Sequence, residues 1–163
     1  QIILDIETTG FDYKKHEIIE FAAILIGNDY SELSSFSALI RPKMKLPERI
    51  TKLTGLTMNT LQHAPYIEEV NPLIQQYISI HHCIGHNIKK FDSLFLKHNN
   101  LLFKNRLIDT LEISRHHKIT DKHSLEYLCQ YYKIRREREH RALDDARATL
   151  QLYKILTMRK GMV

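Results

Sequence analysis

The chain has 163 residues, of which 43% are hydrophobic, and its formal net charge is +5. This length and composition suit one domain with a buried core and exclude a disordered or collagen-like chain. No apolar run reaches the ~18 residues that a membrane helix needs, so we expect no membrane partner. Cys83 and Cys129 form no CxxC motif, which argues against a disulfide framework and indicates a reducing, cytoplasmic location. We expect residues 1–163 to be a single domain of a longer protein, because the chain opens directly into an apolar run.

The first part of the chain is predicted to be mainly β-structure. Residues 1–7 alternate in polarity and residues 17–27 are mostly apolar, and each pattern is typical of a buried strand. The turn at residues 27–29 favours a hairpin into an antiparallel strand over residues 30–40. Residues 41–65 carry three of the four prolines, which indicates a loop with short helical turns.

The rest of the chain alternates between helices and short strands. Short strands are predicted at residues 82–85 and 107–109, and a charged connector at 135–139. Helices are predicted over 66–79, 88–98 and 142–158, with two more that begin at Thr110 and after Ser124. An early hairpin followed by alternating elements predicts a three-layer α/β domain with a mixed sheet.

Carboxylates that interrupt buried faces are the first sign of a site, because a buried acid is costly unless it is paired or bound to metal. Asp5 and Glu7 lie two residues apart on one face of the first strand, ~6.5 Å apart at Cα, so both can reach one cation. The alternative is a strand end that emerges into solvent. Asp92 falls inside the apolar stripe of the 88–98 helix, although an acid in a first turn also suits the helix dipole.

The last helix contains an internal control. Asp145 shares a helical face with Ala142 and Leu152, whereas Asp144 aligns with Arg147 and Lys154 on a charged face. We therefore predict that Asp145 points inward and Asp144 outward.

If Asp5, Glu7, Asp92 and Asp145 converge, four negative charges share one small volume, which requires cations. Oxygen ligands favour Mg²⁺ or Mn²⁺, and two such ions are the usual device for phosphoryl displacement. His140, five residues before Asp145, is the candidate general base because imidazole titrates near neutral pH. An ordinary surface histidine is the alternative.

Three segments, DIETTG (5–10), GHNIKKFD (85–92) and HRALDDA (140–146), occur in the order of the three motifs of the DEDD superfamily of 3′–5′ exonucleases, histidine subtype, which they closely resemble. PERITKLTGLT (47–57) is similar to the exonuclease domain of bacterial DNA polymerase III, as in its epsilon subunit. The resemblance implies an RNase H-like exonuclease fold, with a mixed five-stranded sheet flanked by helices, that covers nearly the whole chain.

The same resemblance implies two-metal hydrolysis of the 3′-terminal phosphodiester of single-stranded DNA, with release of nucleoside 5′-monophosphates and proofreading for, or association with, DNA polymerase III. Asp5, Glu7, Asp92 and Asp145 match the ligands of two divalent cations, Mg²⁺ or Mn²⁺, and His140 matches the base. Substrate contacts are implied for Thr8, Thr9, Gly10, Thr54, Gly55, His86 and Asn87.

Two alternatives remain open from the sequence. The same chemistry could act on RNA or short oligonucleotides, as in oligoribonuclease relatives. A non-catalytic nucleic-acid or polymerase-binding module would instead have lost one or more acids. Contacts with the nucleic-acid backbone are expected from four arginines beside the base, Arg135, Arg136, Arg138 and Arg141. Lys89 and Lys90 either contact phosphates as well or are simply solvated.

Overall fold

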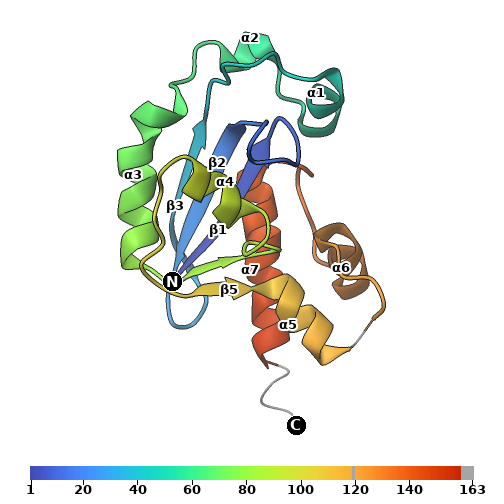
Figure 1. Cartoon of the computed structure of the whole chain (residues 1–163). Helices are drawn as coiled ribbons and strands as arrows, with labels where there is room; N and C mark the ends of the chain where they lie inside the picture. The colour runs from blue at the N-terminus through green and yellow to red at the C-terminus, as the bar shows by residue number, and fades with distance from the viewer. Residues whose placement is uncertain (119, 159–163) are drawn as a thin grey trace.

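A five-stranded mixed sheet, with the order β3-β2-β1-β4-β5, forms the centre of the computed structural model, which describes residues 1–118 and 120–158 (Figure 1). β1 pairs antiparallel with β2, and β2 with β3, whereas β4 and β5 run parallel to β1. The strands are β1 (Ile2–Thr8), β2 (Ile18–Ile26), β3 (Glu32–Leu39), β4 (Cys83–Gly85) and β5 (Leu107–Asp109). The predicted hairpin and mixed sheet are confirmed.

Helices cover both faces of this sheet, which makes the predicted three layers. One face packs against α3 and α4, and the other against α7, beside which α5 and α6 lie (Figure 1). The helices are α1 (Glu48–Thr54), α2 (Met58–Leu61), α3 (Ile67–Ile80), α4 (Asp92–His98), α5 (Thr110–His117), α6 (Leu125–Tyr132) and α7 (Ala142–Met158). Within the described ranges, no helix has both the length and the apolar character needed to cross a membrane.

Alternation along β1 sends its side chains into two different environments. Leu4 and Ile6 are buried in the core that includes α3 and α4. Ile3 lies in the core formed with α7. Because side chains of a strand alternate between faces, Asp5 and Glu7 share the face of Ile3 and point toward α7.

Helix α4 begins at Asp92, so the prediction of a helix from residue 88 is wrong at its start. Asp109 explains the difference. Its two carboxylate oxygens accept hydrogen bonds from the backbone amides of Asn87 (2.9 Å) and Lys89 (3.2 Å). Asn87 adopts a left-handed conformation with φ of 63°. These contacts hold residues 87–89 in a loop, yet Asp92 remains buried, with 2% of its surface exposed.

Candidate active site

The four predicted carboxylates lie close enough for Asp92, Glu7 and Asp145 to perturb the ionisation of Asp5. Asp5 and Glu7 come from β1, Asp92 from the first turn of α4 and Asp145 from the first turn of α7. Asp5 and Asp145 line an open cleft of about 720 Å³, whose lining also includes Arg136 and His140. Segments far apart in the sequence thus supply one acidic site, as the periodicity of each segment predicts.

Burial and mutual repulsion perturb these acids strongly. Burial, followed by the charges of Asp92 and Glu7, raises the pKa of Asp5 well above its ordinary value. Burial and the Asp145 charge raise the pKa of Glu7 to about 8. Burial raises the pKa of Asp92 to about 7. A nearby cation would stabilise the ionised form of these acids, so the cluster is a favourable place for positive charge.

Glu7, His140 and Asp145 have ligand atoms that all lie within 4.8 Å of one another. This donor set, two carboxylates and an imidazole next to further buried carboxylates, fits a divalent cation in its chemistry. His140 ends the charged connector before α7 and adopts a left-handed conformation, with φ of 56°. The predicted base is therefore placed directly against two of the predicted ligands.

Arg136 supplies positive charge inside the site. Its guanidinium donates to Oδ1 of Asp145 from Nε (2.9 Å) and Nη2 (2.5 Å), and only 6% of its side chain is exposed. Burial raises the pKa of Asp145, and this ion pair opposes the shift. Arg136 is one of the arginines predicted to contact phosphates, but here it neutralises a buried acid.

Arg138 and Arg141 also form ion pairs within the domain, so the predicted contacts of these arginines with the nucleic-acid backbone stay a prediction. Arg138 pairs with Asp144 (2.9 Å), and Arg141 pairs with Glu20 (2.9 Å). Lys89 similarly pairs with Glu112.

Asp144 corrects one sequence prediction. It is expected on the exposed face of α7, yet it is 4% exposed. The connector that precedes α7 brings Arg138 over its carboxylate, and helix periodicity carries no information about such a covering segment. Asp144 still differs from Asp145, which alone of the two lines the cleft.

Glu20 is a buried acid that the sequence reasoning misses. It lies on β2 directly opposite Glu7, and only 1% of its surface is exposed. The signal was available, because Glu20 interrupts a strand that is otherwise apolar, the same test that singled out Asp5 and Glu7.

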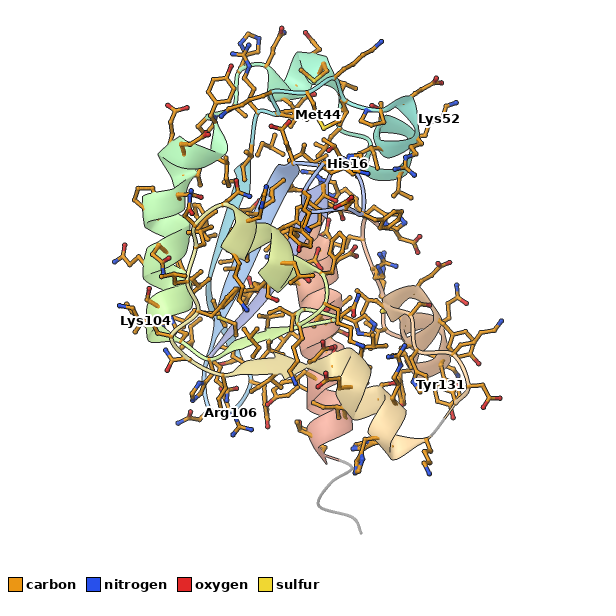
Figure 2. The ribbon with its side chains drawn as sticks, viewed as in Figure 1. His16, Met44, Lys52, Lys104, Arg106 and Tyr131 are labelled. Carbon is orange, nitrogen blue, oxygen red and sulfur yellow. The ribbon has the colours of Figure 1, made fainter. Side chains whose placement is uncertain are left out.

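The turn after β1 is held together by its own hydroxyls. Thr8 donates to the carbonyl of Gly10 (2.7 Å), and Thr9, which is fully buried, accepts from the amide of Glu17 (2.9 Å). The Thr9 hydroxyl also lies close to His16 and Met44, both labelled in Figure 2. A Cβ at residue 10 would lie 2.6 Å from atoms of the His16 ring, which explains Gly10. These side chains shape the turn, and the substrate contacts expected for Thr8, Thr9 and Gly10 stay a prediction.

Thr54 and Gly55 end helix α1. Thr54 is buried, donates to the carbonyl of Ile50 (2.9 Å) and accepts from the amide of Leu56 (3.1 Å). Gly55 caps the helix with φ of 72°, a conformation that glycine adopts without steric cost. Neither residue is among those that line the cleft.

His86 and Asn87 do line the cleft. Nδ1 of His86 lies 3.0 Å from the Thr110 hydroxyl, and Nε2 lies 2.9 Å from the carbonyl of His123. Both ring nitrogens are thus engaged with protein atoms, which fixes the ring as a wall of the cleft.

Phe11, at the lip of the cleft, is a second feature that the sequence reasoning does not single out. It is 77% exposed, packs edge-on against Phe91 at 6.4 Å between ring centres, and has the Arg49 guanidinium 5.8 Å from its ring centre. Exposed aromatic rings beside cations are typical of surfaces on which nucleobases stack.

The profile of the exonuclease family matches residues 2–153, and the chain belongs to this family. Within it, the domain is homologous to the epsilon subunit of DNA polymerase III. It is 35% identical to that subunit from Aquifex aeolicus over 164 residues, which cover 95% of this chain and 79% of the relative. It is also 35% identical to the PolC-type DNA polymerase III of Clostridium perfringens over 158 residues, which cover 94% of this chain. The chain spans only 11% of that polymerase.

Solved structures confirm the exonuclease fold. Exonuclease X in complex with 5′ overhanging duplex DNA has a TM-score of 0.79 at 23% identity, over 98% of this chain and 92% of that one. E. coli Exonuclease I in complex with a dT13 oligonucleotide has a TM-score of 0.86 at 18% identity, over 99% of this chain and 41% of that one.

Proposed function

We propose that the domain is a 3′–5′ exonuclease that removes nucleoside 5′-monophosphates from single-stranded DNA. The observation that carries this proposal is the cleft in which Asp5 and Asp145 lie beside His140, within a cluster of buried acids. Homology to the DNA polymerase III epsilon subunit supports the direction and the substrate.

Asp5, Glu7, Asp92 and Asp145 are the proposed ligands of two divalent cations, Mg²⁺ or Mn²⁺. When bound, such a pair supplies Lewis acidity for phosphodiester hydrolysis. The chain holds acids whose pKa values are raised by burial and by one another, so a bound cation would stabilise their ionised forms. Arg136 already supplies positive charge at Asp145.

His140 is the proposed general base. In the reaction, the oxygen of a water forms a bond to the terminal phosphorus, and the bond from phosphorus to the 3′-oxygen of the preceding nucleotide breaks. The imidazole accepts the proton of the water, and the 3′-oxygen leaves on the shortened strand. The imidazole lies beside Glu7 and Asp145, so a water held by these acids would be within its reach.

Substrate would enter along the wall formed by Phe11, His86 and Asn87, all of which line the cleft. The backbone of Thr8, Thr9 and Gly10 is proposed to meet the terminal nucleotide, with Thr54 and Gly55 supporting the neighbouring loop. We further propose that residues 1–163 belong to a longer protein, and that the domain works with a DNA polymerase, as the named relatives do.

One experiment tests both the reaction and the substrate. Single-stranded DNA and RNA of the same sequence, labelled at the 5′ end, are incubated with the domain and Mg²⁺, and a chelator is added to a parallel sample. We expect a ladder that shortens from the 3′ end, faster on DNA, and absent with chelator. Faster cleavage of RNA would favour the oligoribonuclease alternative. An intact domain that shortens neither strand would overturn the proposal.

A further inference from the structure

Glu20 and Arg141 form a buried ion pair for which the proposed chemistry has no use. The Glu20 carboxylate accepts from Nη2 (2.9 Å) and Nε (3.1 Å) of Arg141. It accepts a third bond, at 3.1 Å, from the backbone amide of Ala142, the first residue of α7. One acid on β2 therefore holds both the side chain and the backbone of the segment that follows His140.

The position of Glu20 is electrostatically unfavourable on its own. Its register partner on β1 is Glu7, and two acids directly opposite each other in a sheet oppose one another's ionisation. Its burial removes the solvation that a carboxylate needs. The two-bond contact with Arg141 offsets these costs, because Arg–carboxylate pairs of this kind are strong and directional. A pair placed in such a position is expected to have a geometric role.

The backbone beside this pair has an unusual conformation. His140 has φ of 56°, a left-handed conformation that is sparsely populated for residues other than glycine. Such a residue persists only where the surrounding structure holds it. Arg141 and Ala142 are fixed by Glu20, and the carbonyl of Arg141 accepts from the amide of Asp145 (2.9 Å). The turn is thus anchored on its carboxyl side to β2 and to α7.

We propose that Glu20, acting through Arg141 and the amide of Ala142, is the positioning residue that keeps His140 directed at Glu7 and Asp145. The inference rests on the proposed function, in which His140 accepts the proton of water. Glu20 touches neither substrate nor reacting atoms in this scheme. Its carboxylate oxygens are bound by Arg141 and by the amide of Ala142, so it is not proposed as a cation ligand.

Helix α7 offers a matched control. Arg147 pairs with Glu32 on β3 through Nη2 (3.0 Å) and Nε (3.2 Å), so the residue types and the bonding pattern are the same. This second pair lies at the surface, with 42% and 31% of the two side chains exposed. Glu32→Gln therefore removes the same kind of Arg–carboxylate pair from α7 itself without touching the turn at His140.

The test measures kcat and KM on a labelled single strand for Glu20→Gln and Glu32→Gln. Misplacement of a base by about 1 Å can cost ~100-fold, so we expect kcat of Glu20→Gln to fall ~10- to 100-fold with KM changed less than about 3-fold. Glu32→Gln should stay within about 2-fold. Arg141→Lys keeps the positive charge but cannot donate two parallel hydrogen bonds to Glu20. We therefore expect its kcat to lie between those of the unmodified domain and Glu20→Gln. If Glu20→Gln does not fold, Arg141→Lys carries the same comparison.

A double variant separates positioning from general damage. In a His140→Ala background, Glu20→Gln should reduce kcat little further, because there is no base left to misplace. An equal reduction in both backgrounds, or full activity of Glu20→Gln, would overturn the inference. Should the unmodified domain cleave neither DNA nor RNA, the proposed function fails first. In that case, NMR chemical shifts of the His140 ring test the positioning role separately. Relative to the unmodified domain, these shifts should change in Glu20→Gln and not in Glu32→Gln. Unchanged shifts in Glu20→Gln would overturn the positioning role.

Discussion

The two faces of the sheet differ most at the carboxyl end of β1. On the face covered by α3 and α4, the strand presents Leu4 and Ile6 to a wholly apolar core. On the face covered by α7, it presents Ile3 to an apolar core and then Asp5 and Glu7 to an acidic cleft. One strand therefore contributes to stability with one set of alternate residues and to chemistry with the other.

This difference teaches how a small domain can carry several buried acids. Each buried acid lowers the folding stability because it is poorly solvated, and its raised pKa reflects this cost. The burial of Leu4 and Ile6 on the other face offsets this cost. Asp5 and Glu7 should consequently be replaceable without loss of stability, and Leu4 and Ile6 without direct loss of chemistry.

The largest expected effect comes from the acidic face. Asp145→Asn should lower kcat at least ~1000-fold, on the scale of losing a principal catalytic group. Asp144→Asn should retain most activity, because Asp144 is paired with Arg138 and does not line the cleft. Single-turnover rates on a labelled strand give the comparison. Equal losses in the two variants would refute the assignment of Asp145 to the site.

The next largest effect is expected on the apolar face of the sheet, and it concerns stability. Ile6→Ala should lower the free energy of unfolding by about 2–5 kcal/mol, because Ile6 is almost fully buried in the core beside α3 and α4. Asp5→Asn, one residue away, should leave the metal-free protein at least as stable, since it removes an acid whose ionisation is opposed by burial. Urea denaturation of both variants measures this. A larger loss for Asp5→Asn would show that the acid is structural.

A smaller effect is expected at the lip of the cleft. Phe11→Ala should raise KM for a single strand by roughly 5-fold or more, because stacking of a base on an aromatic ring contributes ~1–3 kcal/mol. Stability should change little, since Phe11 is 77% exposed. Tyr131→Ala is a useful control, because Tyr131 is an exposed aromatic residue on α6, does not line the cleft and is labelled in Figure 2. Similar KM changes in both would argue against a stacking site at Phe11.

The most gradual effect concerns pH. The pKa of Glu7 rises from an ordinary 4.5 to about 8 in the fold, so between these values the folded chain holds a proton that the unfolded chain releases. Stability of the metal-free protein should therefore fall as pH rises from about 5 to 8. Mn²⁺ should reduce this fall. Thermal unfolding across that range, with and without Mn²⁺, tests the sign, and a rise in stability toward pH 8 without metal would contradict it.

Much of this architecture could be predicted from the sequence because its signals are local. The hairpin turn at residues 27–29 and the bounds of α7 follow from turn chemistry and periodicity. The inward direction of Asp5, Glu7 and Asp145 follows from the same patterns. These predictions needed no knowledge of distant contacts.

The misses depend mainly on contacts that helix or strand periodicity does not encode. Asp109 delays the start of α4 from a position far along the chain, and Arg138 covers Asp144 from a connector with no periodicity. The Glu20–Arg141 pair joins residues that are 121 positions apart. Glu20 itself could have been found, because an acid within a buried strand is a local signal, but its partner could not.

The acids of the site come from β1, α4 and α7, near the beginning, middle and end of the described chain. A partly synthesised or partly folded chain that lacks α7 cannot assemble them, so the proposed cation binding would require the complete fold. Any ion held there stabilises the folded state by mass action, in proportion to the logarithm of its free concentration. The supply of divalent ions would then set how long the domain survives proteolysis, as well as how fast it works.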